Sequence, residues 1–199
     1  MRSVAVPVLL VVALTSACGD QNDEPASSPA TSAATTTPSI AVSVPPTSRQ
    51  ANMGRAPVNS DPCRELGDDV VTKAGFDPGT RQRIDRIFDT YSFVGCQFDH
   101  KERDQFGMNS PTRTLFVNST NITLDEFRAR EGERAEPAQV NGRNAISYQS
   151  PEAEACYIVV ETGAGTLSIG KSVAGVLTQE KPCDRMQEIA ETIASAMPG

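Results

Sequence analysis

Cysteines are the residues of this chain whose type and number point most directly to chemistry. They are Cys18, Cys63, Cys96, Cys156 and Cys183. No two of them stand in a C-x-x-C arrangement, so neither a zinc site nor a thioredoxin-like redox pair is expected. Widely spaced cysteines instead form disulfides in exported proteins, because those proteins fold in an oxidising compartment. The role of these thiols therefore depends on where the chain is sent.

An export signal occupies the N-terminus. One positive charge comes first, and residues 4–14 then form an apolar run of signal-peptide length that is too short to span a bilayer. The small residues that lead into Cys18 resemble the lipobox of bacterial lipoproteins, whose cysteine receives a diacylglycerol and becomes the mature N-terminus. Residues 1–17 are thus expected to be a lipoprotein signal peptide, and the alternative is a secretory signal cleaved near Ala17.

The lipobox resemblance implies that acyl chains such as palmitate on Cys18 hold the protein at the cell membrane, on its extracytoplasmic face. Each buried lipid CH₂ contributes ~0.8 kcal/mol, so three chains need no help from the protein. The formal net charge is −7, with acidic and basic residues interspersed. No basic patch is present that would bind nucleic acid or anionic lipid, so the membrane contact is expected through Cys18 and no nucleic-acid partner is expected.

Residues 18–60 are expected to form a disordered tether. Ser, Thr, Ala and Pro dominate this segment, and it contains few large apolar residues. Such a composition buries too little surface to offset the entropy lost on ordering. The same composition suits O-glycosylation of an exported stalk, and an unmodified linker is the alternative.

Residues 61–199 are expected to form one folded domain. If Cys18 carries lipid, four cysteines remain, and they allow three pairings. Cys63 and Cys183 each follow a proline at the start of an expected helix, whereas Cys96 and Cys156 lie in expected strands. Pairing like with like predicts one disulfide between Cys63 and Cys183 and another between Cys96 and Cys156.

The elements that position these residues alternate between helix and strand. Helices are expected over 62–74, 123–131 and 182–197, and strands over 91–99, 112–122, 137–140, 143–149, 155–161 and 166–173. Segment 81–89 stays open between a short helix and an exposed stretch. Thr123 and Glu126 fit a capping box, and Asn141-Gly142 is typical of a tight hairpin. The order predicts an α+β fold in which N- and C-terminal helices pack on an antiparallel sheet.

Four short segments resemble an uncharacterised family of actinobacterial lipoproteins, a domain of unknown function that includes some mycobacterial Lpr-type proteins. They are DPC at 61–63, AGFDP at 74–78, GCQF at 95–98 and KPC at 181–183. The resemblance covers about residues 61–199 and implies an envelope location, but it supplies no active site. The order of elements is also similar to that of PsbP-like sandwiches, an analogy that implies no function.

Residues for catalysis or for a cofactor are not evident. The only histidine, His100, lies in a charged segment, so no Ser/His/Asp or Cys/His arrangement and no multi-histidine metal site is expected. We therefore expect no cofactor and no enzymatic activity. A carboxylate-dependent hydrolase, with Asp99, Glu102 and Asp104 in a cleft, is the weakest of the alternatives.

Two other functions fit a tethered domain without catalytic chemistry. The first is a non-catalytic module that binds an envelope protein or a glycan. The second is a carrier of a lipid or small hydrophobic ligand. An enclosed cavity under the terminal helix, lined by residues such as Phe127, Ile158 and Met186, would favour the carrier.

Overall fold

The computed structural model describes residues 38–103 and 106–199. The expected signal peptide, Cys18 and the first part of the expected tether lie outside the described residues, so export and lipidation stay predictions. No described helix is long and apolar enough to cross a membrane.

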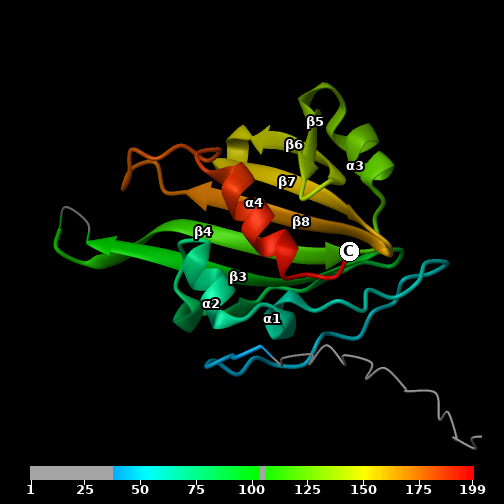
Figure 1. Ribbon diagram of the computed structural model, residues 1–199, viewed down its shortest axis with the longest axis horizontal. Coiled ribbons are helices and arrows are strands. Elements are labelled where there is room, and N and C mark those ends of the chain that lie inside the picture. The colour runs from blue at the N-terminus through cyan, green and yellow to red at the C-terminus, as the bar shows by residue number, and fades with distance from the viewer. Residues whose placement is uncertain (1–37, 104–105) are drawn as a thin grey trace, which may run out of the picture. The chain divides into compact units, whose positions relative to one another are not determined.

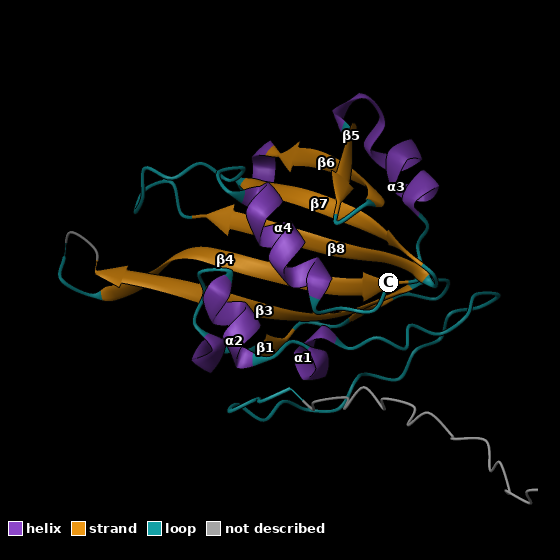
Figure 2. Cartoon of the chain, viewed as in Figure 1, coloured by secondary structure: helices purple, strands orange, loops and turns teal. Residues whose placement is uncertain are grey.

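An eight-stranded antiparallel sheet forms the centre of the domain (Figures 1 and 2). Its strands are β1 (Gln82–Arg83), β2 (Arg86–Ile87), β3 (Ser92–Arg103), β4 (Asn109–Thr120), β5 (Glu136–Val140), β6 (Arg143–Ser150), β7 (Ala155–Thr162) and β8 (Gly165–Val173). The order across the sheet is β1-β3-β4-β8-β7-β6-β5, and β2 also pairs with β3. The β7–β8 hairpin thus lies between β4 and β6. The predicted α+β fold is confirmed.

Helices lie on both faces of this sheet. They are α1 (Pro62–Glu65), α2 (Asp68–Lys73), α3 (Leu124–Glu131) and α4 (Met186–Ser195), with 3₁₀ turns at Pro78–Thr80, Gly132–Arg134 and Pro151–Ala153. Figure 1 shows α1, α2 and α4 over one face, which we call the covered face. Helix α3 packs against β6 and β7 from the other side. We call this second side the open face, because α3 covers only part of it.

Strand alternation sends side chains to these two faces in turn. On β3, Cys96 and Phe98 belong to the core beneath α1, α2 and α4. Phe93 on the same strand packs on the open face with Phe127 of α3. The sheet therefore buries Phe93 in a different cluster from Cys96 and Phe98.

Two local motifs form as the sequence predicts. The Thr123 hydroxyl accepts a hydrogen bond from the Glu126 N–H while the Glu126 carboxylate accepts one from the Thr123 N–H, which completes the capping box of α3. Asn141 and Gly142 connect β5 to β6 with φ angles of 51° and 77°. Positive φ at both central residues is what the tight hairpin turn requires.

The structure differs from the expectation at residues 62–74, and it decides between the two alternatives left open for residues 81–89. One helix was expected over residues 62–74, but the segment forms two short helices, α1 and α2. The backbone of Leu66 is extended, and Gly67 is the N-cap of α2. Segment 81–89 forms neither a helix nor a free stretch. It contributes β1 and β2, which pair with β3 at the edge of the sheet.

The described part of the expected tether, residues 38–60, packs on the domain, and we call it the strap. The Ser48 N–H donates to Asp85 Oδ2 at 2.8 Å, and the Met53 N–H donates to the Asp89 carbonyl at 2.8 Å. Asn52 is buried, and its Oδ1 accepts from the Ser92 hydroxyl. The folded part therefore begins before residue 61. Polar contacts hold the strap together with two apolar side chains, since Val58 is buried and Val44 packs against the covered-face core.

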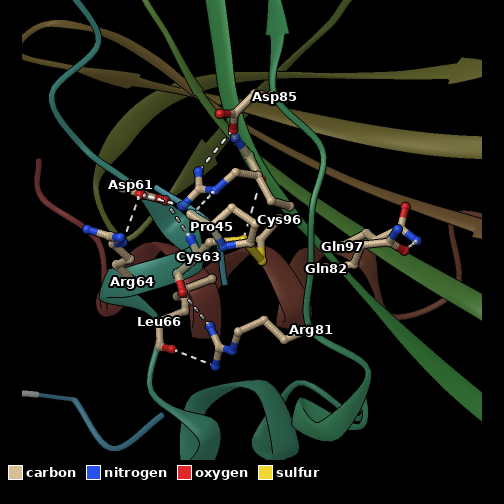
Figure 3. The surroundings of a disulfide bond; sticks show 12 residues. Pro45, Asp61, Cys63, Arg64, Leu66, Arg81, Gln82, Asp85, Cys96 and Gln97 are labelled. Carbon is tan, nitrogen blue, oxygen red and sulfur yellow. Dashed lines mark hydrogen bonds and ion pairs between the residues drawn. A yellow bond between two sulfur atoms is a disulfide. The ribbon is translucent and has the colours of Figure 1, made fainter. Parts of the chain in front are cut away.

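Both predicted disulfides are wrong, because Cys63 bonds to Cys96 and Cys156 bonds to Cys183. Cys96 on β3 and Cys156 on β7 are separated by β4 and β8. Three strand spacings of about 4.8 Å place them roughly 14 Å apart, beyond the ~7 Å that a disulfide can bridge between Cα atoms. The first bond joins Cys63 in α1 to β3, and the second joins Cys183, in the turn before α4, to β7; Figure 3 shows the first of them.

Arg81 forms hydrogen bonds with the backbone around the Cys63–Cys96 disulfide (Figure 3). Its guanidinium donates to the carbonyls of Cys63 and Leu66 at 3.1 and 2.9 Å and to Asp68 Oδ1 at 2.7 Å. These carbonyls end α1, where no intrahelical donor is present to satisfy them. Arg81 therefore stabilises the break between α1 and α2.

Candidate binding site on the open face

A pocket of about 660 Å³ lies on the open face, between α3 and the segment that contains β2. The chain has three tyrosines and seven phenylalanines. All three tyrosines and four of the phenylalanines line this pocket: Phe88, Tyr91, Phe93, Phe116, Phe127, Tyr148 and Tyr157. Ligand sites are typically lined by aromatic residues with a few well-placed polar groups. This pocket is therefore the candidate functional site.

One row of side chains across four strands forms the aromatic part of the floor. Directly paired residues run from Phe116 on β4 to Gly170 on β8, Tyr157 on β7 and Tyr148 on β6. The two tyrosine rings are stacked, with centroids 5.1 Å apart and planes 16° apart. Because these side chains are half-buried, a ligand can reach the surface that they form.

Gly170 makes room for the Tyr157 ring. A Cβ atom at position 170 would lie 2.5 Å from Tyr157 Cε1, closer than carbon atoms approach. The Tyr157 ring therefore lies over the glycine rather than beside a neighbouring side chain. This arrangement extends the aromatic surface toward the centre of the sheet.

Asn118 lies in the adjacent row, between Gly95 on β3 and Ser168 on β8. It lines the pocket and is only 4% exposed, yet its Oδ1 has no hydrogen-bond partner among the described residues. A Cβ at Gly95 would lie 2.0 Å from this oxygen, so only glycine fits there. An unsatisfied buried acceptor costs about 1–3 kcal/mol. A donor supplied by a ligand would remove that cost.

Helix α3 supplies one rim of the pocket. Arg130 stacks over the Phe127 ring at 4.4 Å. Glu131 accepts from Arg130 at 2.9 Å and from Arg134 at 2.8 Å, so its charge is compensated by two guanidinium groups. The strap helps to hold α3 in place, since Arg55 forms an ion pair with Glu126 in its first turn.

The opposite rim is the β2 segment. The Arg86 guanidinium lies over the Phe93 ring at 5.1 Å and forms no ion pair with any residue in 38–103 or 106–199. Phe88 and Tyr91 continue this rim, with ring centroids 4.7 Å apart. Phe88 is 44% exposed and so offers an apolar surface at the mouth of the pocket.

Asp85 secures this rim to the sheet. Burial alone would raise the pKa of its carboxyl. The backbone N–H groups of Ser48 and Gly95, together with the Arg83 guanidinium, outweigh burial and hold the pKa below its ordinary value. Asp85 is therefore a paired anion, held by the strap, by β3 and by a neighbouring cation.

The stacked tyrosines remain neutral phenols at physiological pH. Burial raises the pKa of Tyr148 to about 12, and the charge of Glu131 acts in the same direction. Burial also raises the pKa of Tyr157, although the positive charge of Arg86 opposes this. Both hydroxyls can therefore donate hydrogen bonds at the pocket floor.

The three residues named for a possible carrier cavity under the terminal helix do not line a common cavity. Ile158 and Met186 both belong to the covered-face core, and each is at most 3% exposed. Phe127 lies on the opposite face, because α3 and α4 pack on different sides of the sheet. Of the three, only Phe127 lines the pocket on the open face.

The acidic residues named for hydrolysis lie elsewhere. Asp99 accepts a hydrogen bond from the Thr114 hydroxyl at 2.8 Å, and Glu102 contacts His100 and Arg113. Neither carboxylate lines the pocket, and Asp104 is outside the described residues. Over residues 38–103 and 106–199, no group of three or more His, Cys, Asp or Glu side chains is placed to hold a metal ion.

The fold and the pocket define an α+β domain with a ligand-sized site on the open side of its sheet. A family model described as "Protein of unknown function (DUF3558)" matches residues 13–195, so the chain belongs to this family. The expected membership in a domain of unknown function is confirmed at this level. No curated protein and no solved structure matches the chain.

Proposed function

We propose that this protein is a membrane-anchored extracytoplasmic lipoprotein and that its domain is a non-catalytic module that binds a glycan of the bacterial envelope. The N-terminal signal that ends at Cys18 supports export and anchoring. The two disulfides of the domain agree with an oxidising compartment. The glycan is proposed to bind in the open-face pocket.

The observation that carries this proposal is the combination of stacked rings and an unsatisfied amide in one floor. Sugar rings present apolar C–H faces and hydroxyl edges. The Tyr148–Tyr157 surface matches the faces, and the Asn118 Oδ1 can accept from a hydroxyl. Gln97, Ser150 and Ser168 add polar groups around the same floor.

A carrier of a small hydrophobic ligand is the second candidate. The exposed ring of Phe88 and the row of aromatic side chains favour it. Such a ligand would leave Asn118 Oδ1 unsatisfied, and this argues for the glycan. A protein partner in place of the glycan would have to insert a donor group into the same pocket.

NMR spectroscopy of the ¹⁵N-labelled protein, carrying Cys18→Ser so that it stays in solution, tests the proposal. Glycan fragments released by partial hydrolysis of the producing organism's envelope should shift the signals of pocket residues. Tyr157→Ala should weaken the binding by about tenfold or more, since it removes one of the two stacked rings. Phe106→Ala, an exposed aromatic residue outside the pocket, is the matched control.

The outcomes separate the candidates. Shifts at the pocket with dodecanoate but not with the glycan fragments would replace the glycan by a hydrophobic ligand. Glycan-induced shifts that are confined to other surfaces, or no shifts at millimolar fragment concentration, would overturn the proposal.

A further inference from the structure

We infer that the pocket recognises an acidic saccharide, which donates a hydroxyl to Asn118 at the buried floor and places an anionic group against Arg86 at the rim. This inference rests on the proposed function and adds the charge and the orientation of the ligand. The anionic group is a carboxylate or a phosphate ester, since both fit an arginine side chain in the same way.

The charges around the pocket support an anionic ligand. The whole chain carries a net charge of −7, but three arginines and only two acids line this site: Arg86, Arg130 and Arg134, with Asp85 and Glu131. Both acids are already compensated within the protein, Asp85 by Arg83 and Glu131 by Arg130 and Arg134. Arg86 is the cation of the pocket that the described residues leave without an acidic partner.

The position of Arg86 suits anion recognition. Its guanidinium lies over the face of the Phe93 ring. A guanidinium held over an aromatic ring by a cation–π contact can still use its N–H groups to bind a carboxylate or phosphate with two parallel hydrogen bonds. The β2–β3 pairing that places Arg86 directly opposite Phe93 holds this geometry.

Asn118 fixes the other end of the ligand. Its unsatisfied oxygen is buried on β4 in the middle of the sheet, whereas Arg86 is exposed on the β2 edge strand. An amide oxygen accepts and cannot donate, so the group that reaches it must be a hydroxyl or an N–H. A sugar ring that rests on the floor between these two residues can direct a hydroxyl inward and its acidic substituent outward.

The test divides the envelope glycan fragments by anion exchange into a neutral and an acidic pool and measures the affinity of each by calorimetry. The wild-type protein should bind the acidic pool about tenfold or more tightly than the neutral pool. Raising the salt concentration should weaken binding of the acidic pool alone, because exposed charges are screened. Phosphatase treatment of the acidic pool removes phosphate esters, and carbodiimide coupling to methylamine neutralises carboxylates, so the treatment that abolishes the preference identifies the anionic group.

Variants assign the two contacts. Arg86→Gln should reduce the preference for the acidic pool to less than about twofold, and Arg86→Lys should restore part of it. Arg49→Gln removes the same charge from an exposed strap residue outside the pocket and should leave the preference unchanged. Asn118→Leu should weaken the binding of both pools by a similar factor, with the thermal unfolding curve confirming that the variant is folded.

Failure of the inference and failure of the proposed function give different results. Equal binding of both pools, with no effect of Arg86→Gln, overturns the acidic ligand and leaves the glycan module intact. Absence of binding for both pools overturns the glycan module as well. Unchanged binding by a folded Asn118→Leu protein overturns the role of the buried amide.

Discussion

At the scale of single residues, the pocket contains a buried amide oxygen that lowers the stability of the folded protein. The Asn118 side chain is buried, and its oxygen has no partner within the described structure. Leu115 and Val117 on the same strand point to the opposite face of the sheet, where they are fully buried in the covered-face core. A buried acceptor without an internal partner is rare in folded proteins, and the proposed contact with a ligand hydroxyl depends on this observation.

Asn118→Leu is therefore expected to raise the free energy of unfolding by about 1–2 kcal/mol, because it removes an unsatisfied acceptor at nearly constant volume. Urea denaturation followed by circular dichroism measures this change. Asn144→Leu, an exposed change on β6, should alter stability by less than about 0.5 kcal/mol. A loss of stability in Asn118→Leu equal to that of an ordinary core mutation would show that Asn118 is satisfied within the fold.

Single residues also show what the sequence could have indicated. Period-two alternation on β8 places Lys171 on the same face as Leu167 and Ile169, and the structure buries it completely, with Glu180 and the Asp184 carbonyl as its partners. The alternation alone predicts this inward position. The partners come from the loop before α4, which has no periodic pattern, so the sequence could not identify them.

At the scale of elements, short-range signals predicted more than long-range ones. The capping box of α3, the Asn141-Gly142 hairpin and the terminal helix are each encoded by neighbouring residues, and all three form. The disulfides, the strap and the edge strands β1 and β2 depend on which distant segments pack together. Neither the type of element that holds a cysteine nor the composition of a segment carries information about that packing. Pairing like with like therefore gave the wrong disulfides, and composition did not indicate that the strap packs on the domain.

The disulfides give a direct check at this scale. Peptide mapping under non-reducing conditions should recover Cys63 linked to Cys96 and Cys156 linked to Cys183. Replacing both Cys156 and Cys183 by alanine opens a loop with a sequence separation of 27, and the free energy of unfolding should fall by about 3 kcal/mol. A peptide that links Cys63 to Cys183 would contradict the packing of α1 and α4 described above.

The contact between the strap and α3 should respond to pH. A hydrogen bond from Arg55, followed by one from the Thr123 backbone, lowers the pKa of Glu126 from 4.5 to about 2. Because the folded-state pKa is lower than the unfolded value, the stabilisation is fully present above pH 4.5 and is lost as the pH falls toward 2. Both side chains are partly exposed, so the pair contributes only a modest stabilisation.

Carboxyl ¹³C NMR of Glu126 should therefore titrate with a midpoint near 2. Arg55→Gln should raise this midpoint toward the ordinary value without reaching it, since the Thr123 hydrogen bonds remain. Arg49→Gln is the control for loss of a strap charge and should not move it. An ordinary midpoint in the wild-type protein would mean that the strap does not contact α3 in solution.

At the scale of the whole molecule, the pocket depends on the strand order. Phe116, Tyr157 and Tyr148 are brought into one row because β8 and β7 lie between β4 and β6. No local pattern predicts this order, so the sequence alone does not indicate a pocket on the open face. The alternation of Phe116 and Asn118 with Leu115 and Val117 was the available signal that β4 has a second face of different composition.

The location of the molecule is open to a separate test. If Cys18 carries the proposed lipid, the protein should sediment with membranes, and its mature N-terminal peptide should begin at a diacylglyceryl-modified Cys18 in mass spectrometry. Cys18→Ser should release the protein from the membrane fraction. A mature chain that begins elsewhere with an unmodified residue would contradict the anchor and leave the pocket unaffected.

The placement of the tyrosines has a practical consequence. The chain contains no tryptophan, and Tyr91, Tyr148 and Tyr157 are its only tyrosines. Because all three line the same pocket, the intrinsic ultraviolet fluorescence of the protein comes almost wholly from that site. Occupancy can thus be followed by quenching or enhancement of this emission without a label, so unmodified protein can be screened directly against fractions of unknown composition.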